Sequence, residues 1–130
     1  MNQKGFATLE VILMVVIIGI LATVAVPRFT DMTMKANTAK IQADLSTLDN
    51  AIEIYYMDKG EYPDDISDLG DYVKDVGNLK PPTGKAFTKD SSGEITISDS
   101  DNYEITTSNS QTRATLSGKT SGDFSIKKGS

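Results

Sequence analysis

The chain has 130 residues, 38% of them hydrophobic, a formal net charge of −5 at pH 7, and neither cysteine nor histidine. The negative charge disfavours direct binding to nucleic-acid phosphates, which requires clustered Lys and Arg, and the lack of cysteine excludes disulfides and thiolate ligands. Without Cys or His the chain lacks the commonest general base and metal ligand and the best nucleophile, so we expect it not to be an enzyme.

An apolar run from residue 6 to residue 26 follows a short N-terminal segment whose only charge is Lys4. Its length of about 21 residues is enough to cross a hydrocarbon core as a helix. By the positive-inside rule, Lys4 keeps the N-terminal end on the cytoplasmic side and leaves everything after Arg28 outside the cytoplasm. The run therefore predicts a single-pass anchor in the cytoplasmic membrane.

A secretory signal peptide is one alternative for this run. The run is longer than the usual core of about 7–15 residues, and no small-x-small cleavage site follows it, since Ala25–Pro27 is succeeded by Arg28 and Phe29. A plain anchor fits the length but leaves Glu10 unexplained, because a carboxylate inside an apolar span costs about 2.5–3.5 kcal/mol on insertion scales. Glu10 therefore requires a cationic partner.

The segment Lys4–Glu10, followed by Gly19–Ala22 and Ala25–Pro27, closely resembles the class III signal and transmembrane helix of type IV pilins and pseudopilins. The motif combines a glycine, a following phenylalanine, a glutamate at fixed distance, an apolar run and a proline at its end. This resemblance favours a filament subunit over a plain anchor or an uncleaved signal.

In that family a prepilin peptidase cuts after the glycine and methylates the new N-terminus. The resemblance implies a leader of residues 1–5, cleavage between Gly5 and Phe6, and N-methylation of Phe6. It also implies that the helix of residues 6–27 spans the membrane first and forms the filament core later. There Glu10 can pair with the cationic amine of Phe6 on a neighbouring subunit, and since an unpaired charge in that setting is costly, the pair sets the stagger between subunits.

Gly19 and Pro27 bear on how this helix packs, bends and melts. Val15 and Thr23, rather than glycines, lie four residues from Gly19, which argues against a GxxxG contact. Pro27 lacks a backbone donor and is expected to kink the helix. Because pilins of the family can lose helical order in this region in assembled filaments, we expect the segment from Gly19 to Pro27 to melt on assembly.

Residues 28–59 are predicted to continue as an amphipathic helix half. Apolar residues recur at spacings of four, three, four and three, which places them on one face. Lys59–Gly60 predicts the helix end, since glycine is favoured just beyond a C-terminus. The apolar stripe comprises Ile41, Leu45, Leu48, Ile52 and Tyr55, and the opposite face carries Lys40, Gln42, Asp44, Asp49, Asn50 and Glu53.

Residues 60–130 are predicted to form a globular head. Gly60–Pro63 resembles the Tyr-Pro signature that follows the long helix in many pilins and major pseudopilins. Asp64 or Asp65 is expected to cap a short helix, and the surrounding acidic cluster is interpreted as a solvated face, with a cation site as the alternative. The inner side of the short helix carries Ile66, Leu69, Val73 and Val76, and the acidic cluster comprises Asp64, Asp65, Asp68, Asp71 and Asp75.

From Gly93 onward, short runs with strand composition alternate with turn-rich residues. They predict an antiparallel sheet of three or four strands against the apolar stripe, which is the α+β fold of the family. Lys80–Gly84 is predicted to be the loop joining the helical part to the sheet. The predicted strands are residues 94–98, 103–107, 113–117 and 124–127.

The loop residues Asp99, Asp101 and Asn102 place hard oxygen ligands close together, as calcium requires, and are equally usual in a hairpin loop. We therefore expect no cofactor, with calcium at these residues as the alternative. Major pseudopilins of type II secretion usually carry an Asp-Pro-Trp-Gly type motif before the sheet, whereas this chain has no tryptophan. These residues do not decide between a type IV pilin and a pseudopilin.

The expected function is that of the major subunit of a type IV pilus, a structural protein for adhesion, motility or surface attachment. Its expected partners are further copies of itself, the prepilin peptidase, the pilus or secretion assembly machinery and, before assembly, the membrane; its final place is an extracellular filament. One alternative is a pseudopilin of a type II secretion system or a competence pilus. A lower alternative is an N-terminally anchored extracytoplasmic binding protein, which would keep the bond between Gly5 and Phe6 intact.

Overall fold

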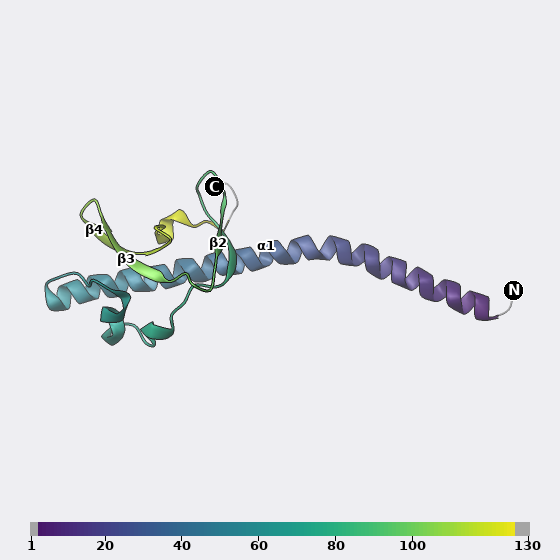
Figure 1. Cartoon of the computed structure of the whole chain (residues 1–130), viewed down its shortest axis with the longest axis horizontal. Coiled ribbons are helices and arrows are strands. Elements are labelled where there is room, and N and C mark those ends of the chain that lie inside the picture. Colours follow the sequence, from purple (N-terminus) through teal and green to yellow (C-terminus); the bar gives the residue numbers. More distant parts are fainter. Residues whose placement is uncertain (1–2, 127–130) are drawn as a thin grey trace. The chain divides into compact units, whose positions relative to one another are not determined.

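The computed structural model describes residues 3–126 (Figure 1). The chain divides into two compact units, Met1–Thr33 and Met34–Ser130. One helix, α1 (Gln3–Lys59), runs through the first unit and begins the second. The expected α+β class, with a long N-terminal helix and antiparallel strands, is confirmed. The remaining elements, all in the second unit, are the 3-10 helices η1 (Ile66–Asp71), η2 (Val76–Asn78) and η3 (Ser121–Asp123), and the strands β1 (Gly84–Phe87), β2 (Glu94–Ile97), β3 (Tyr103–Ser108) and β4 (Gln111–Leu116).

The predicted apolar stripe of α1 lies at the centre of the core of the second unit. Ile41, Leu45, Leu48 and Ile52 are fully buried, and Tyr55 packs against the same cluster. Their four-three spacing keeps successive side chains on one helix face, which is why they meet the rest of the fold together. The periodicity prediction is therefore confirmed.

The helix ends where the sequence predicts. Gly60 follows Lys59 with a φ of 77°, and its N–H donates to the carbonyl of Tyr56 at 2.8 Å. Glycine adopts this left-handed conformation without the steric penalty that a Cβ brings.

The short helix expected after Pro63 is η1, with Asp65 at its N-cap. The carboxylate of Asp68 accepts hydrogen bonds from the backbone N–H groups of Asp64 and Asp65 at 3.1 and 3.2 Å. All five aspartates of this region are exposed, in agreement with the solvated-face interpretation. All four predicted inner residues face the core, with Leu69 and Val73 buried and Ile66 and Val76 packed against it, but they do not share one helix. The helix η1 ends at Asp71, so Val73 follows it and Val76 begins η2.

The strands form two separate antiparallel hairpins, β1–β2 and β3–β4. The prediction of a single sheet of three or four strands is therefore wrong. Both hairpins send side chains into the core around the helix stripe, so a shared core joins them instead of a continuous ladder of hydrogen bonds. The prediction also missed β1, which begins at Gly84, the last residue of the expected loop.

The predicted strand at residues 124–127 is not a strand in the part of the chain that the structure describes. Phe124 forms an isolated bridge with Thr88, and Ser125 donates its N–H to the carbonyl of Phe87 at 3.3 Å. The carbonyl of Asp123, the last residue of η3, accepts from the N–H of Lys89 at 2.9 Å, so the segment pairs with the residues after β1 through isolated bonds. Lys127 lies outside the described residues.

Two residues of the polar face of α1, opposite the apolar stripe, contact the second half of the fold. Gln42 donates its amide to the carbonyl of Phe124 at 2.9 Å, and Asp44 accepts from the hydroxyl of Tyr103 at 2.6 Å. Periodicity identifies the apolar face of a helix but not how far neighbouring elements cover its flanks. The polar flank therefore anchors the hairpins as well as facing water.

Candidate subunit-assembly surface

In the first unit, the apolar side chains of α1 from Phe6 to Val24 are all exposed. Their exposed fractions run from 49% at Leu9 to 66% at Ile18. Apolar surface in water costs about 25 cal/mol per Å² relative to burial, so a continuous surface of this kind requires lipid or protein around it. This part of α1 is long and apolar enough to cross a membrane.

The polar side chains within this segment differ in whether they have a hydrogen-bond partner inside the helix. The hydroxyl of Thr8 donates to the carbonyl of Lys4 at 2.9 Å, and that of Thr23 donates to the carbonyl of Ile20 at 2.7 Å. These bonds satisfy both hydroxyls inside the helix. The carboxylate of Glu10 has no hydrogen-bond or ion-pair partner within residues 3–126, so it is the group that needs a partner from outside this chain.

The predicted processing site lies at the start of the same helix. Gly5, Phe6 and Glu10 all fall within the first turns of α1, and Phe6 is 57% exposed. Residues four apart lie on one face of a helix, so Phe6 and Glu10 share a face. Cleavage and methylation at Phe6 stay predictions, and residues 1 and 2 of the predicted leader lie outside the described part.

Gly19 and Pro27 both lie within the continuous helix α1. A Cβ added at Gly19 would meet no other atom within 4 Å, so no contact inside this chain requires glycine there. The expected kink at Pro27 and the melting of the segment on assembly are not tested by the isolated chain and stay predictions. If Gly19 is required at all, the requirement lies in the assembled state.

Each of the candidate calcium ligands has a hydrogen-bond partner within the chain. Asp99 accepts from the hydroxyl of Thr83 at 2.7 Å, while Asp101 accepts from the N–H of Ser98 at the same distance. The amide of Asn102 donates to the carbonyl of Ser100 at 3.1 Å. Across residues 3–126, no group of three or more acidic side chains is arranged to hold a metal ion. Asp101 and Asn102 thus close the turn between β2 and β3, while Asp99 connects that turn to Thr83, which precedes β1.

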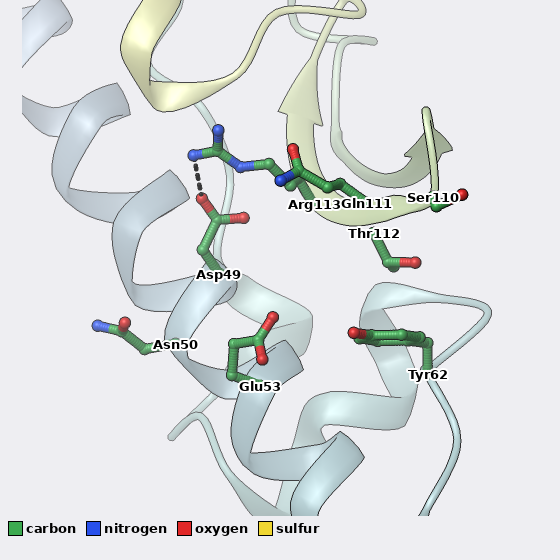
Figure 2. Close-up of a pocket in the computed structure, with 8 residues that line it drawn as sticks. All are labelled: Asp49, Asn50, Glu53, Tyr62, Ser110, Gln111, Thr112 and Arg113. Carbon is green, nitrogen blue, oxygen red and sulfur yellow. Dashed lines mark hydrogen bonds and ion pairs between the residues drawn. The ribbon is translucent and has the colours of Figure 1, made fainter.

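Sequence reasoning missed a polar groove in the second unit, shown in Figure 2. It has a volume of about 380 Å³ and lies between α1, the segment after its end, and β4. Its lining comes from stretches some fifty residues apart in the sequence, each of ordinary surface composition, so no local signal indicates it. The groove is lined by Asp49, Asn50, Glu53, Tyr62, Ser110, Gln111, Thr112 and Arg113.

Comparisons with known proteins identify curated relatives of this chain. The chain is 33% identical over 89 residues to the type II secretion system core protein G of Escherichia coli (strain K12), an alignment covering 68% of this chain and 60% of that protein. It is 38% identical over 80 residues to the protein of the same name from Vibrio cholerae, covering 62% and 55%. It is 44% identical over 54 residues to the type IV narrow pilus major component PilA5 of Thermus thermophilus, covering 42% and 47%.

The chain therefore spans less than two thirds of the length of these curated relatives. No protein-family model matches it, and no solved structure does. The long apolar N-terminal helix and the α+β fold are consistent with the relatives named for type II secretion and for a type IV pilus. The chain belongs to the type IV pilin and pseudopilin family.

Proposed function

We propose that this protein is the major subunit of a type IV pilus, made as a membrane-anchored precursor, cut between Gly5 and Phe6, and polymerised through α1. The observation that carries the proposal is the exposed apolar surface of residues 6–24, which includes one carboxylate, Glu10, without a partner among residues 3–126. Lipid covers such a surface before assembly, and packed copies of the same helix cover it in a filament. The role is mechanical, and we propose no catalytic activity.

The pairing of Glu10 follows from the same surface. Once cleaved, Phe6 carries a cationic amine at the tip of the helix, and Glu10 lies one turn further on. Neither charge can be buried alone in an apolar core, because leaving one member of such a pair unpartnered costs about 3–5 kcal/mol. A neighbouring subunit that brings its amine to Glu10 satisfies both charges and fixes the axial offset between the two copies.

A type II secretion pseudopilin is the second candidate. The relatives aligned over 89 and 80 residues, from Escherichia coli and Vibrio cholerae, are both named as core protein G of that system. In this case the same helix would assemble a short filament serving protein secretion. Adhesion and motility would then not depend on the chain.

Electron microscopy of cells with and without the gene separates the two candidates. Long surface filaments that contain this chain and vanish on deletion support the pilus. Loss of protein secretion on deletion, in cells that show no surface filament, supports the pseudopilus. A monomer that stays in the membrane under every condition contradicts both.

A further inference from the structure

The groove of Figure 2 has walls that are already held in place. Asp49 accepts from the guanidinium of Arg113 at 2.9 Å and from the N–H of Ala114 at 2.8 Å. The ring of Tyr62 stacks on Tyr56, with 4.4 Å between centroids and 19° between planes. A pocket whose walls are fixed before binding loses little conformational entropy when a ligand enters.

Several groups at the groove have no hydrogen-bond partner among residues 3–126. These are the carboxylate of Glu53, the hydroxyl of Tyr62 and the amide of Gln111. Figure 2 shows the carboxylate of Glu53 and the hydroxyl of Tyr62 pointing toward one another, with Gln111 and Arg113 on the β4 side and the amide of Asn50 pointing away. The groove therefore presents unused donors and acceptors beside an aromatic ring that is 39% exposed.

The charges of the walls disfavour an anionic ligand. A phosphate or carboxylate would face the negative charge of Glu53, while the positive charge of Arg113 is already paired with Asp49. A neutral polyhydroxyl compound avoids that repulsion and can use the open donors and acceptors, because each hydroxyl group donates one hydrogen bond and accepts others. A cation, which Glu53 would attract, is distinguished from it by the salt dependence of binding. The exposed part of the Tyr62 ring offers apolar surface to the C–H groups of a sugar ring.

We propose that this groove binds a neutral saccharide, with Glu53 and Tyr62 as hydrogen-bonding residues and Gln111 as a third contact. Its volume of about 380 Å³ lies at the small end of the ~300–1,000 Å³ usual for ligand pockets, which suits the terminal part of a sugar chain. The site lies wholly in the second unit, so it does not depend on the proposed filament. A filament would present one groove per subunit and so add avidity to a weak single contact.

The test uses the purified full chain in a detergent without a sugar head group. The probes are immobilised neutral oligosaccharides ending in glucose, galactose, mannose or N-acetylglucosamine. We expect retention on at least one probe, and unchanged retention between about 0.1 and 1 M NaCl, where the Debye length falls from about 10 to 3 Å. Glu53→Ala should bind roughly tenfold more weakly, and Tyr62→Phe, which keeps the ring stack, severalfold more weakly.

Glu104→Ala is the matched control, because it removes an exposed carboxylate of β3 that does not line the groove. It should bind as the parent chain does. Three results overturn the proposal: no retention on any probe, equal retention by Glu53→Ala and Glu104→Ala, or retention that is lost at high salt. Because binding is measured on unassembled chain, failure here leaves the filament proposal intact, and failure to form filaments leaves this one intact.

Discussion

The guanidinium of Arg113 on β4 contacts the carboxylate of Asp49 on α1 at 2.9 Å. The second oxygen of the same carboxylate accepts from the N–H of Ala114 at 2.8 Å. One side chain of the helix is thereby bonded to two consecutive residues of the strand. This pair of contacts fixes the β3–β4 hairpin against the helix and forms one wall of the polar groove.

Asp49→Ala should lower the free energy of unfolding by about 1–3 kcal/mol, because it leaves the N–H of buried Ala114 without its partner. The ion pair itself adds little, since the Arg113 side chain is 40% exposed. Urea unfolding of the full chain in detergent measures the change. Asn50→Ala, at the exposed neighbouring position, should stay within about 0.5 kcal/mol of the parent. Equal stability of the two variants would show that Asp49 does not anchor the hairpin.

Gly60→Ala should destabilise the second unit by about 1–2 kcal/mol, because alanine pays a steric penalty at the left-handed φ of 77° that ends α1. Gly77→Ala is the control: an added Cβ there meets nothing within 4 Å and the residue has no positive φ. The same unfolding measurement applies. A Gly60→Ala variant as stable as Gly77→Ala would mean that the helix end relaxes freely.

The hydroxyl of Tyr72 donates to the carboxylate of Asp58, and this bond, with burial, raises the pKa of Tyr72 to about 12. The folded state therefore holds this proton more tightly than the unfolded chain, whose tyrosines ionise near pH 10. The resulting stabilisation is complete below about pH 10 and is lost as the pH rises toward 12. Asp58→Ala should move the pKa of Tyr72 down toward 10, as seen in the ultraviolet absorbance of tyrosinate.

Tyr72→Phe identifies which part of that absorbance change belongs to Tyr72. It should remove the component that appears near pH 12 in the parent chain. A titration that Asp58→Ala leaves unaltered would rule out the carboxylate as the cause.

Glu10→Ala should leave the cut after Gly5 intact and reduce the yield of sheared filaments by roughly tenfold or more, because the amine of Phe6 then has no counter-charge in the core. Thr23→Ala is the control within the same segment, since the hydroxyl of Thr23 is already bonded to the carbonyl of Ile20. It should assemble normally. Filaments in normal amount from Glu10→Ala would remove Glu10 from assembly.

The parts of the fold that follow from local pattern were predicted from the sequence. The stripe from Ile41 to Tyr55 and the end of α1 at Gly60 need only the helical period and the conformational freedom of glycine. The strand β1 was missed because it begins on a turn glycine and has no β-branched residue, whereas β2, of the same length, has three. The division into two hairpins depends on how the core is shared, which no local pattern reveals.

The assembly surface and the polar groove also differ in how far the sequence alone predicts them. Gly5, Phe6 and Glu10 lie within one short motif, so the sequence alone identifies them, and the structure adds the exposure of the helix around them. The groove depends on Asp49 meeting Arg113, a contact between residues 64 positions apart. Before folding, Asp49 is indistinguishable from any solvated carboxylate on the polar face of a helix.

The most direct test of the central claim is mass spectrometry of the N-terminal peptide from sheared filaments, in cells that contain prepilin peptidase. The account predicts a chain that begins at Phe6 and carries one N-methyl group, while a Gly5→Val variant stays uncut in the membrane fraction. Filaments whose subunits still begin at Met1, or filaments that lack this chain altogether, would contradict it.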